Sequence, residues 1–134
     1  MELRKATPRD YRWIMNAVCR KHLDYCTTQH IMSDFGLDRL YAVVDGDKVL
    51  ATVSLVYDSE YQYTAIKRLC ILNKKNRGKG IARFALSAIQ KEVKGRIGAT
   101  PWWDNEPMRH ILESQGFIFK YTFNYKWCFY MKEV

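Results

Sequence analysis

The chain has 134 residues, of which 48% are hydrophobic and 14% aromatic, so it is long and apolar enough to bury one core. This composition excludes an intrinsically disordered chain. The net charge of +8 resides in the second half, because residues 1–64 hold 8 basic and 9 acidic side chains and residues 65–134 hold 14 and 5. An anionic partner is expected there, either a polyanion such as RNA or a small molecule that carries phosphate.

The N-terminal segment, MELRKATPRD, has no apolar core of a secretory signal. The most apolar stretch, residues 49–57, is about half the roughly 20 residues that a membrane-spanning helix needs. We therefore expect one soluble, cytoplasmic domain over residues 1–134, with no membrane partner. No C-x-x-C pair or histidine cluster is present, so we expect no metal and interpret the cysteines as reduced core thiols, namely Cys19, Cys26, Cys70 and Cys128.

The first predicted elements are a short strand over residues 2–6 and a helix. Thr7 suits the N-cap position of this helix, and Asp10 follows it three residues later. Apolar residues then recur at helical spacing to about His22. Residues 23–38 are polar and irregular, with room for a short second helix.

Three predicted strands follow. Residues 40–44 and 48–57 alternate with strand character around the turn sequence DGD, which is typical of a tight hairpin. Residues 63–72 form a third apolar strand that runs directly into a basic, glycine-containing segment. The pattern becomes helical after Gly80, and Gly95 closes this helix.

The C-terminal third is predicted as strand, helix and hairpin. A short strand covers residues 96–102, and Asp104 or Asn105 caps a helix that stops at Gly116. Residues 117–131 make the final hairpin. The predicted order is β-α-(α)-β-β-β-α-β-α-β-β, an α/β sandwich with a mixed, largely antiparallel sheet.

Residues 73–83, NKKNRGKGIAR, lie between a strand and an amphipathic helix. The first N–H groups of a helix lack partners within it and the helix dipole is positive there, so an anion binds readily. Gly78 and Gly80 let the backbone approach a phosphate closely. We interpret the segment as a pyrophosphate-binding loop whose charge comes from Lys74, Lys75, Arg77, Lys79 and Arg83.

Two common phosphate motifs do not fit this loop. The P-loop pattern G-x-x-x-x-G-K-[ST] is absent, and Arg83 replaces the third glycine of the dinucleotide pattern G-x-G-x-x-G. A nuclear-localisation tract would be exposed and unstructured, whereas this segment is fixed between two core elements.

Residues 68–86, RLCILNKKNRGKGIARFAL, resemble the acetyl-CoA motif of the GNAT superfamily of N-acetyltransferases, whose pattern is [Q/R]-x-x-G-x-[G/A] after a strand. We match Gly78 and Gly80 to its small positions, with Lys75 in place of the leading Gln or Arg. Residues 105–117 resemble the later family helix, N-x-x-A-x-x-x-Y-x-x-x-G-F. The resemblance covers nearly the whole chain and implies a GNAT-like three-layer sandwich.

The resemblance also implies how the coenzyme binds. The loop amides would hold the pyrophosphate of acetyl-CoA, the end of the preceding strand would pair with the pantetheine arm, and the Leu72 N–H would polarise the thioester oxygen. Asn105 would either bind the pantetheine or cap its helix. The expected contact residues are Cys70, Ile71, Leu72, Lys74, Lys75, Asn76, Arg77, Gly78, Lys79, Gly80, Ile81, Ala82, Arg83 and Asn105.

The chain departs from the family pattern at the acid and the base. The usual tyrosine of the later helix is Leu112 here, and the strand over residues 63–72 has no carboxylate where relatives carry a glutamate. The candidate acids are Tyr121 and Tyr125, and the candidate bases are Glu60, Asp58 and Asp104. Nearby aromatic residues would either wall an acceptor pocket or fill the core, namely Tyr57, Tyr61, Tyr63, Trp102 and Trp103.

The resemblance predicts an acetyl-CoA-dependent N-acetyltransferase, monomeric or homodimeric, that acts on the amine of a small molecule or peptide. The missing acid and base leave open a CoA-binding module with little catalysis. The basic second half leaves open an acyltransferase that acts on an RNA-linked amine. Removing the five loop cations from its surplus of nine leaves +4, so nucleic acid is compatible but not required.

Overall fold

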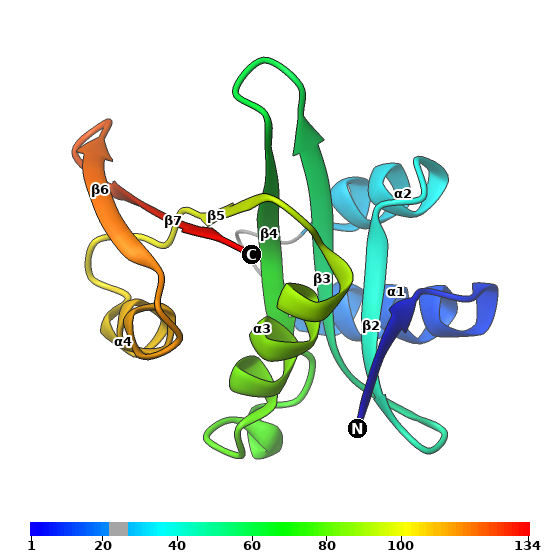
Figure 1. Cartoon of the computed structure of the whole chain (residues 1–134). Coiled ribbons are helices and arrows are strands. Elements are labelled where there is room, and N and C mark those ends of the chain that lie inside the picture. The colour runs from blue at the N-terminus through cyan, green and yellow to red at the C-terminus, as the bar shows by residue number, and fades with distance from the viewer. Residues whose placement is uncertain (22–26) are drawn as a thin grey trace.

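The structure is a computed structural model that describes residues 1–21 and 27–134, in which helices cover both faces of a seven-stranded sheet (Figure 1). The predicted end of the first helix at His22 lies outside the described residues. In chain order the elements are β1 (Glu2–Lys5), α1 (Pro8–Lys21), α2 (Thr28–Gly36), β2 (Leu40–Asp45), β3 (Lys48–Asp58), β4 (Tyr63–Ile71), the 3₁₀ turn η1 (Lys74–Asn76), α3 (Ile81–Glu92), β5 (Arg96–Ala99), α4 (Glu106–Ser114), β6 (Ile118–Phe123) and β7 (Trp127–Glu133).

The strands lie in the order β1-β2-β3-β4-β5-β7-β6. Neighbouring strands are antiparallel except β4 and β5, which are parallel. This parallel pair follows from α3, which crosses over between them. The predicted element order and the mixed, largely antiparallel α/β sandwich are therefore confirmed.

Two helix pairs bury opposite faces of the sheet. On one face, Ile14 of α1 and Ile31 of α2 pack against strand residues such as Ala42 and Cys70. On the other face, Leu86 of α3 and Leu112 of α4 belong to a second cluster with strand residues of β3, β4, β5 and β7. Apolar positions alternate between the faces along the strands, and this alternation makes the protein three-layered.

The predicted start of α1 is confirmed in detail. The Thr7 Oγ1 accepts the Asp10 N–H, and the Asp10 carboxylate accepts the Thr7 N–H, both at 3.1 Å. Arg4 of β1 also donates to both oxygens of Asp10, at 3.1 and 3.0 Å. Asp10 is only 2% exposed, so one buried carboxylate joins the first strand to the first helix.

Two expectations are wrong. The strand predicted over residues 96–102 ends at Ala99, and Trp102 forms only an isolated bridge with Trp127. Cys19 is exposed rather than a core thiol, whereas Cys70 and Cys128 are buried and Cys26 lies outside the described residues.

Among the described residues, no helix is both long and apolar enough to cross a membrane. The same part of the chain contains no group of three His, Cys, Asp or Glu side chains suited to a metal ion.

We predict that Asp10→Asn lowers the free energy of unfolding by about 1–3 kcal/mol, because it removes charge-assisted hydrogen bonds from a buried site. Burial acts to raise the pKa of Asp10, but the hydrogen bonds from Arg4 and Thr7 together lower it below its ordinary value. The unfolded chain therefore takes up the proton first as the pH falls. Urea unfolding should give a constant wild-type advantage above about pH 5 that shrinks below about pH 4. An advantage that persists unchanged at pH 2 would contradict this account.

Candidate functional site

A pocket of about 620 Å³ lies between the end of β4, the first turn of α3 and the start of α4. It is lined by Leu69, Ile71, Asn76, Arg77, Gly78, Gly80, Ile81, Ala82, Arg83, Asn105, Pro107, Met108 and Ile111. A second hollow, of about 430 Å³, is lined by residues of α1 alone. The larger pocket is the candidate site, because it joins an apolar wall to the basic glycine-containing loop.

The loop before α3 forms one wall of this pocket. The Asn73 Oδ1 accepts the Lys75 N–H at 3.0 Å and thereby starts η1. Gly80 is the N-cap residue of α3, so no side chain at this position accepts the first N–H groups of the helix. The first turn of α3 therefore offers its amides and its positive dipole end to an anion.

Both loop glycines adopt the left-handed backbone conformation, with φ of +76° at Gly78 and +79° at Gly80. A Cβ atom added at either position would meet no atom within 4 Å. Backbone conformation rather than crowding therefore requires glycine here, and the space around the loop is open to a ligand.

The start of α3 favours a later register for the GNAT motif than the match that begins at Lys75. The pattern [Q/R]-x-x-G-x-[G/A] is satisfied at all three positions by Arg77, Gly80 and Ala82. In this register the central glycine of the motif is the N-cap residue of α3. Both registers place the same loop against the pocket.

The edge of β4 next to the pocket is open. β5 pairs only with residues 64–66 of β4, and β4 then continues beside β3. The Leu72 N–H donates to the Leu50 carbonyl at 3.0 Å and so points toward β3. The expectation that this N–H polarises a thioester oxygen is wrong. Hydrogen-bonding direction alternates along an antiparallel strand, so the backbone groups of Leu69 and Ile71 point to the open edge.

Cys70 and Leu72 also differ from the other predicted contact residues in where their side chains lie. Both belong to the core beneath α1 and α2, on the face of the sheet opposite the pocket. Neither residue lines the pocket, whereas the neighbouring Ile71 does.

Asn105 combines the two roles that its position suggested. Its Oδ1 accepts the Met108 N–H at 3.3 Å, which confirms it as the N-cap residue of α4. The residue also lines the pocket. The cap uses the carbonyl oxygen, so the side-chain NH₂ group is available to a ligand.

The candidate bases lie in two places, the turn between β3 and β4 and the segment before α4. Glu60 is exposed in the turn between β3 and β4, and Asp104 is exposed just before α4. Asp58 accepts the Tyr61 N–H at 3.0 Å within the same turn as Glu60. At the family's tyrosine position, Leu112 is fully buried. None of the three carboxylates lines the pocket.

Tyr121 does join a cluster. Its ring stacks on Phe129 of β7, with 5.3 Å between centroids and 3° between planes, and Tyr63 of β4 contacts Phe129 edge-to-face at 5.6 Å. The Tyr63 ring lies over Gly98, where a Cβ atom would come within 3.0 Å of it. We call Tyr63, Tyr121 and Phe129 the tyrosine cluster. Tyr125, by contrast, is 97% exposed at the hairpin tip.

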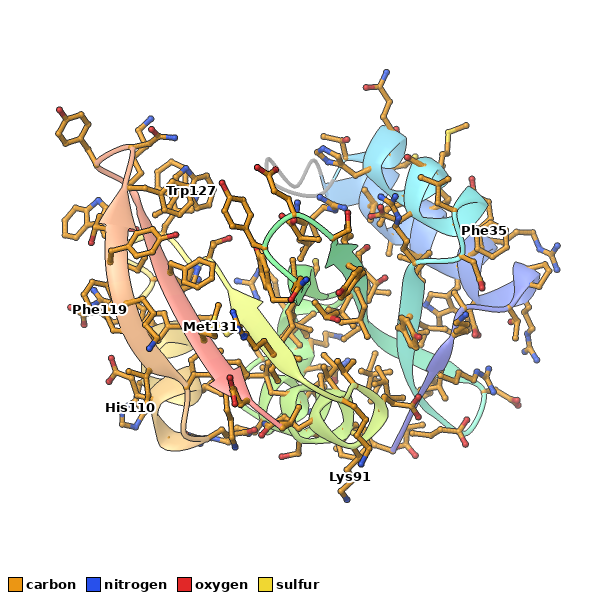
Figure 2. All side chains as sticks on the ribbon, turned by 45° about the horizontal axis from the view of Figure 1, so that its top comes forward. Phe35, Lys91, His110, Phe119, Trp127 and Met131 are labelled. Carbon is orange, nitrogen blue, oxygen red and sulfur yellow. The ribbon has the colours of Figure 1, made fainter. Side chains whose placement is uncertain are left out.

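The tyrosine cluster lies on the face of the sheet opposite the pocket, because Cys128 and Tyr130, on either side of Phe129, belong to the core beneath α3 and α4. Its sheet register places Tyr121 and Phe129 as direct neighbours, and Gly98 pairs with Ala65 only one residue before β4 and β5 separate. Figure 2 shows Trp127, two residues before Phe129, near the tip of the same hairpin. Sequence analysis included Tyr63 and Tyr121 but missed Phe129, because only the pairing of β6 with β7 brings the three rings together.

Burial, the Asp58 carboxylate and the neighbouring hydroxyls of Tyr121 and Tyr61 raise the pKa of Tyr63. The phenol is therefore protonated throughout the physiological pH range. This group of hydroxyls beside one carboxylate makes the cluster polar at its rim and aromatic beneath.

Comparison with known proteins agrees with this geometry. The model of the acetyltransferase (GNAT) family matches residues 4–117. A GNAT-family acetyltransferase from Streptococcus agalactiae 2603 has a TM-score of 0.83 at 16% identity, over 99% of this chain and 95% of that one. No curated protein sequence matches.

Two further structures have the same fold. An aminoglycoside 6'-N-acetyltransferase complexed with coenzyme A gives a TM-score of 0.79 at 11% identity, over 99% of this chain and 97% of that one. A chimeric spermidine N-acetyltransferase from Vibrio cholerae and hSSAT gives 0.75 at 18%, over 98% and 94%. At these identities the likeness establishes the fold.

We predict that Gly98→Ala destabilises the protein by about 1–3 kcal/mol, because the added methyl group meets the Tyr63 ring at 3.0 Å and the Tyr130 carbonyl at 3.2 Å. The matched control is Gly36→Ala, whose methyl group would meet no atom within 4 Å. Thermal unfolding measures both variants. A melting temperature of Gly98→Ala equal to that of the wild type would show that the ring does not lie against Gly98.

Proposed function

The chain belongs to the GNAT family of acetyltransferases, and on this premise we propose that it transfers the acetyl group of acetyl-CoA directly to the amine of a small molecule or peptide. The observation that carries the proposal is the pocket in which a glycine-capped helix start, a basic loop and an open strand edge meet. These are the features that a diphosphate joined to a long amide-containing arm requires.

The basic loop would hold the diphosphate of the coenzyme. The amides of Ile81, Ala82 and Arg83 form the first turn of α3, and all three residues line the pocket. Arg77 adds a full positive charge beside them. Helix dipole, unpartnered amides and guanidinium groups act together on one anion, so binding should weaken as the salt concentration rises.

The open edge of β4 would bind the amide-containing arm as an added strand. Leu69 and Ile71 supply the outward backbone groups, and one of their N–H groups replaces Leu72 as the proposed donor to the thioester oxygen. The side-chain NH₂ group of Asn105 would donate to the same arm. This assignment keeps every proposed contact on the pocket side of the sheet.

Acetyl-CoA supplies an acetyl group on a thiol whose pKa is about 8.5, and such a thiol leaves readily. The acceptor amine must approach from the other side of the separated strands, where the tyrosine cluster lies. Tyr121 and Tyr63 are the proposed proton donors there. Asp58, together with Glu60, is the proposed base that acts through water, and Asp104 is the more distant candidate.

The tyrosine cluster would suit a cationic acceptor, because aromatic faces and a nearby carboxylate both attract organic ammonium groups. Spermidine and aminoglycosides, named in two of the similar structures, are amines of this kind. The rest of the assignment, a single cytoplasmic domain acting as a monomer or homodimer, stays a prediction.

We expect acetyl-CoA at 100 times its Kd to stabilise the protein by roughly 2.7 kcal/mol in thermal unfolding. Gly80→Ala should raise the Kd about tenfold, because alanine disfavours the left-handed N-cap conformation. Gly46→Ala is the matched control, since Gly46 also has positive φ (+59°) and open space but lies in the β2–β3 hairpin. Its Kd should equal that of the wild type.

Three outcomes of this experiment separate the alternatives. No stabilisation by acetyl-CoA would refute the proposed function. Binding without thiol release across an amine panel would favour the CoA-binding module. Tight, salt-sensitive binding of tRNA would favour the RNA-directed acyltransferase that the basic second half leaves open.

We predict that Tyr121→Leu raises the KM for a linear diamine at least fivefold while leaving the Kd of acetyl-CoA unchanged, because the cluster lies on the face opposite the pocket. Tyr125→Leu is the control, as this residue projects from the hairpin tip. Steady-state kinetics with the diamine and a monoamine of equal length measures the effect. Unchanged KM values in Tyr121→Leu would remove the cluster from the acceptor site.

A further inference from the structure

A buried carboxylate lies beneath β4 where the strand passes from pairing with β5 to the open edge. Asp34 of α2 is 3% exposed. It accepts a hydrogen bond from the Ser54 Oγ at 2.6 Å and two from the Arg68 guanidinium, from Nε at 3.2 Å and Nη2 at 2.5 Å. α2 is thereby tied to β3 and β4 through one side chain.

The backbone of Arg68 has φ of +54°, in the left-handed region that non-glycine residues rarely adopt. The register explains this value. Thr52 pairs with Cys70 and Ser54 pairs with Lys67, so β4 has one more residue than β3 over this interval. Arg68 lies in this extra stretch, which is a β-bulge, and such left-handed bulge positions favour glycine.

The bulge decides which residues of β4 face the open edge. A one-residue change in register exchanges the two faces and the two hydrogen-bonding directions of a strand. Without the extra residue, Leu69 and Ile71 would turn their amides toward β3, and Cys70 and Leu72 would face the opening. The observed register instead gives the pocket its apolar wall of Leu69 and Ile71.

We propose that Asp34 is a positioning residue for acetyl transfer. By binding the Arg68 side chain beneath the sheet, it holds residue 68 in the left-handed conformation and so keeps the Leu69 and Ile71 amides directed to the thioester arm. This role rests on the proposed function. If the ion pair only packs α2 on the sheet, the backbone conformation of residue 68 should have no effect on amide exchange in β4 or on the affinity for acetyl-CoA.

Two double variants separate these roles, namely Asp34→Asn with Arg68→Gly and Asp34→Asn with Arg68→Ala. Both lack the ion pair and leave no buried charge unpaired, and they differ in whether residue 68 tolerates positive φ. In ligand-free protein, the rate of amide hydrogen exchange over residues 67–72 should stay close to that of the wild type in the Arg68→Gly double variant. It should be faster in the Arg68→Ala double variant. Isothermal titration should give an acetyl-CoA Kd within about threefold of wild type for Gly and about five- to thirtyfold weaker for Ala.

Equal exchange and equal Kd values in the two double variants would overturn the positioning role. If the alanine variant does not fold, Asn and Ser at residue 68 in the Asp34→Asn background supply the same contrast, because Asn adopts the left-handed region more readily. The exchange measurement needs no ligand. Failure of wild-type protein to bind acetyl-CoA would therefore refute the proposed function, whereas equal exchange with intact binding refutes only the role of Asp34.

Discussion

The separation of β4 from β5 is the constraint on which the site depends. Two parallel strands joined through α3 pair over only three residues of each, 64–66 with 97–99, and then diverge. An unpaired strand edge within a sheet must be satisfied by another chain, by water or by a ligand. The pocket beside α3 and α4 and the tyrosine cluster on the opposite face lie on the two sides of this one opening. A coenzyme on one side and an acceptor on the other would therefore meet across the plane of the sheet.

Sequence reasoning succeeded where the signal is local. The cap of α1 needs only Thr7 and Asp10, three residues apart, and both hydrogen bonds are present. The loop before α3 likewise needs only a strand, two glycines and an amphipathic helix in immediate succession. The register of the motif within that loop is also a local signal, because Arg77, Gly80 and Ala82 satisfy all three positions of the pattern, whereas Lys75 fails the first position of the earlier match. The observed start of α3 after Gly80 agrees with the later register.

Sequence reasoning failed where the answer depends on pairing between distant segments. The direction of the Leu72 N–H is set by a bulge, and no residue pattern within β4 marks this bulge because Arg68 occupies a position that usually favours glycine. Its partner, Asp34, is 34 residues away in a stretch that reads as polar and irregular. The tyrosine cluster likewise draws on β4, β6 and β7, whose order in the sheet is not their order in the chain.

The loss of the family's tyrosine at Leu112 becomes intelligible when the magnitudes are compared. A positioned acid contributes about 10²- to 10⁴-fold, and a thiol leaving group needs it least. Correct orientation of two reactants is worth about 7–11 kcal/mol, and donors aimed at a developing oxyanion add about 3–4 kcal/mol each. Leu112 instead completes a core in which it is fully buried. In the proposed reaction the missing acid would cost about 3–5 kcal/mol, which is less than the orientation of the two reactants that the directed β4 amides would help to preserve.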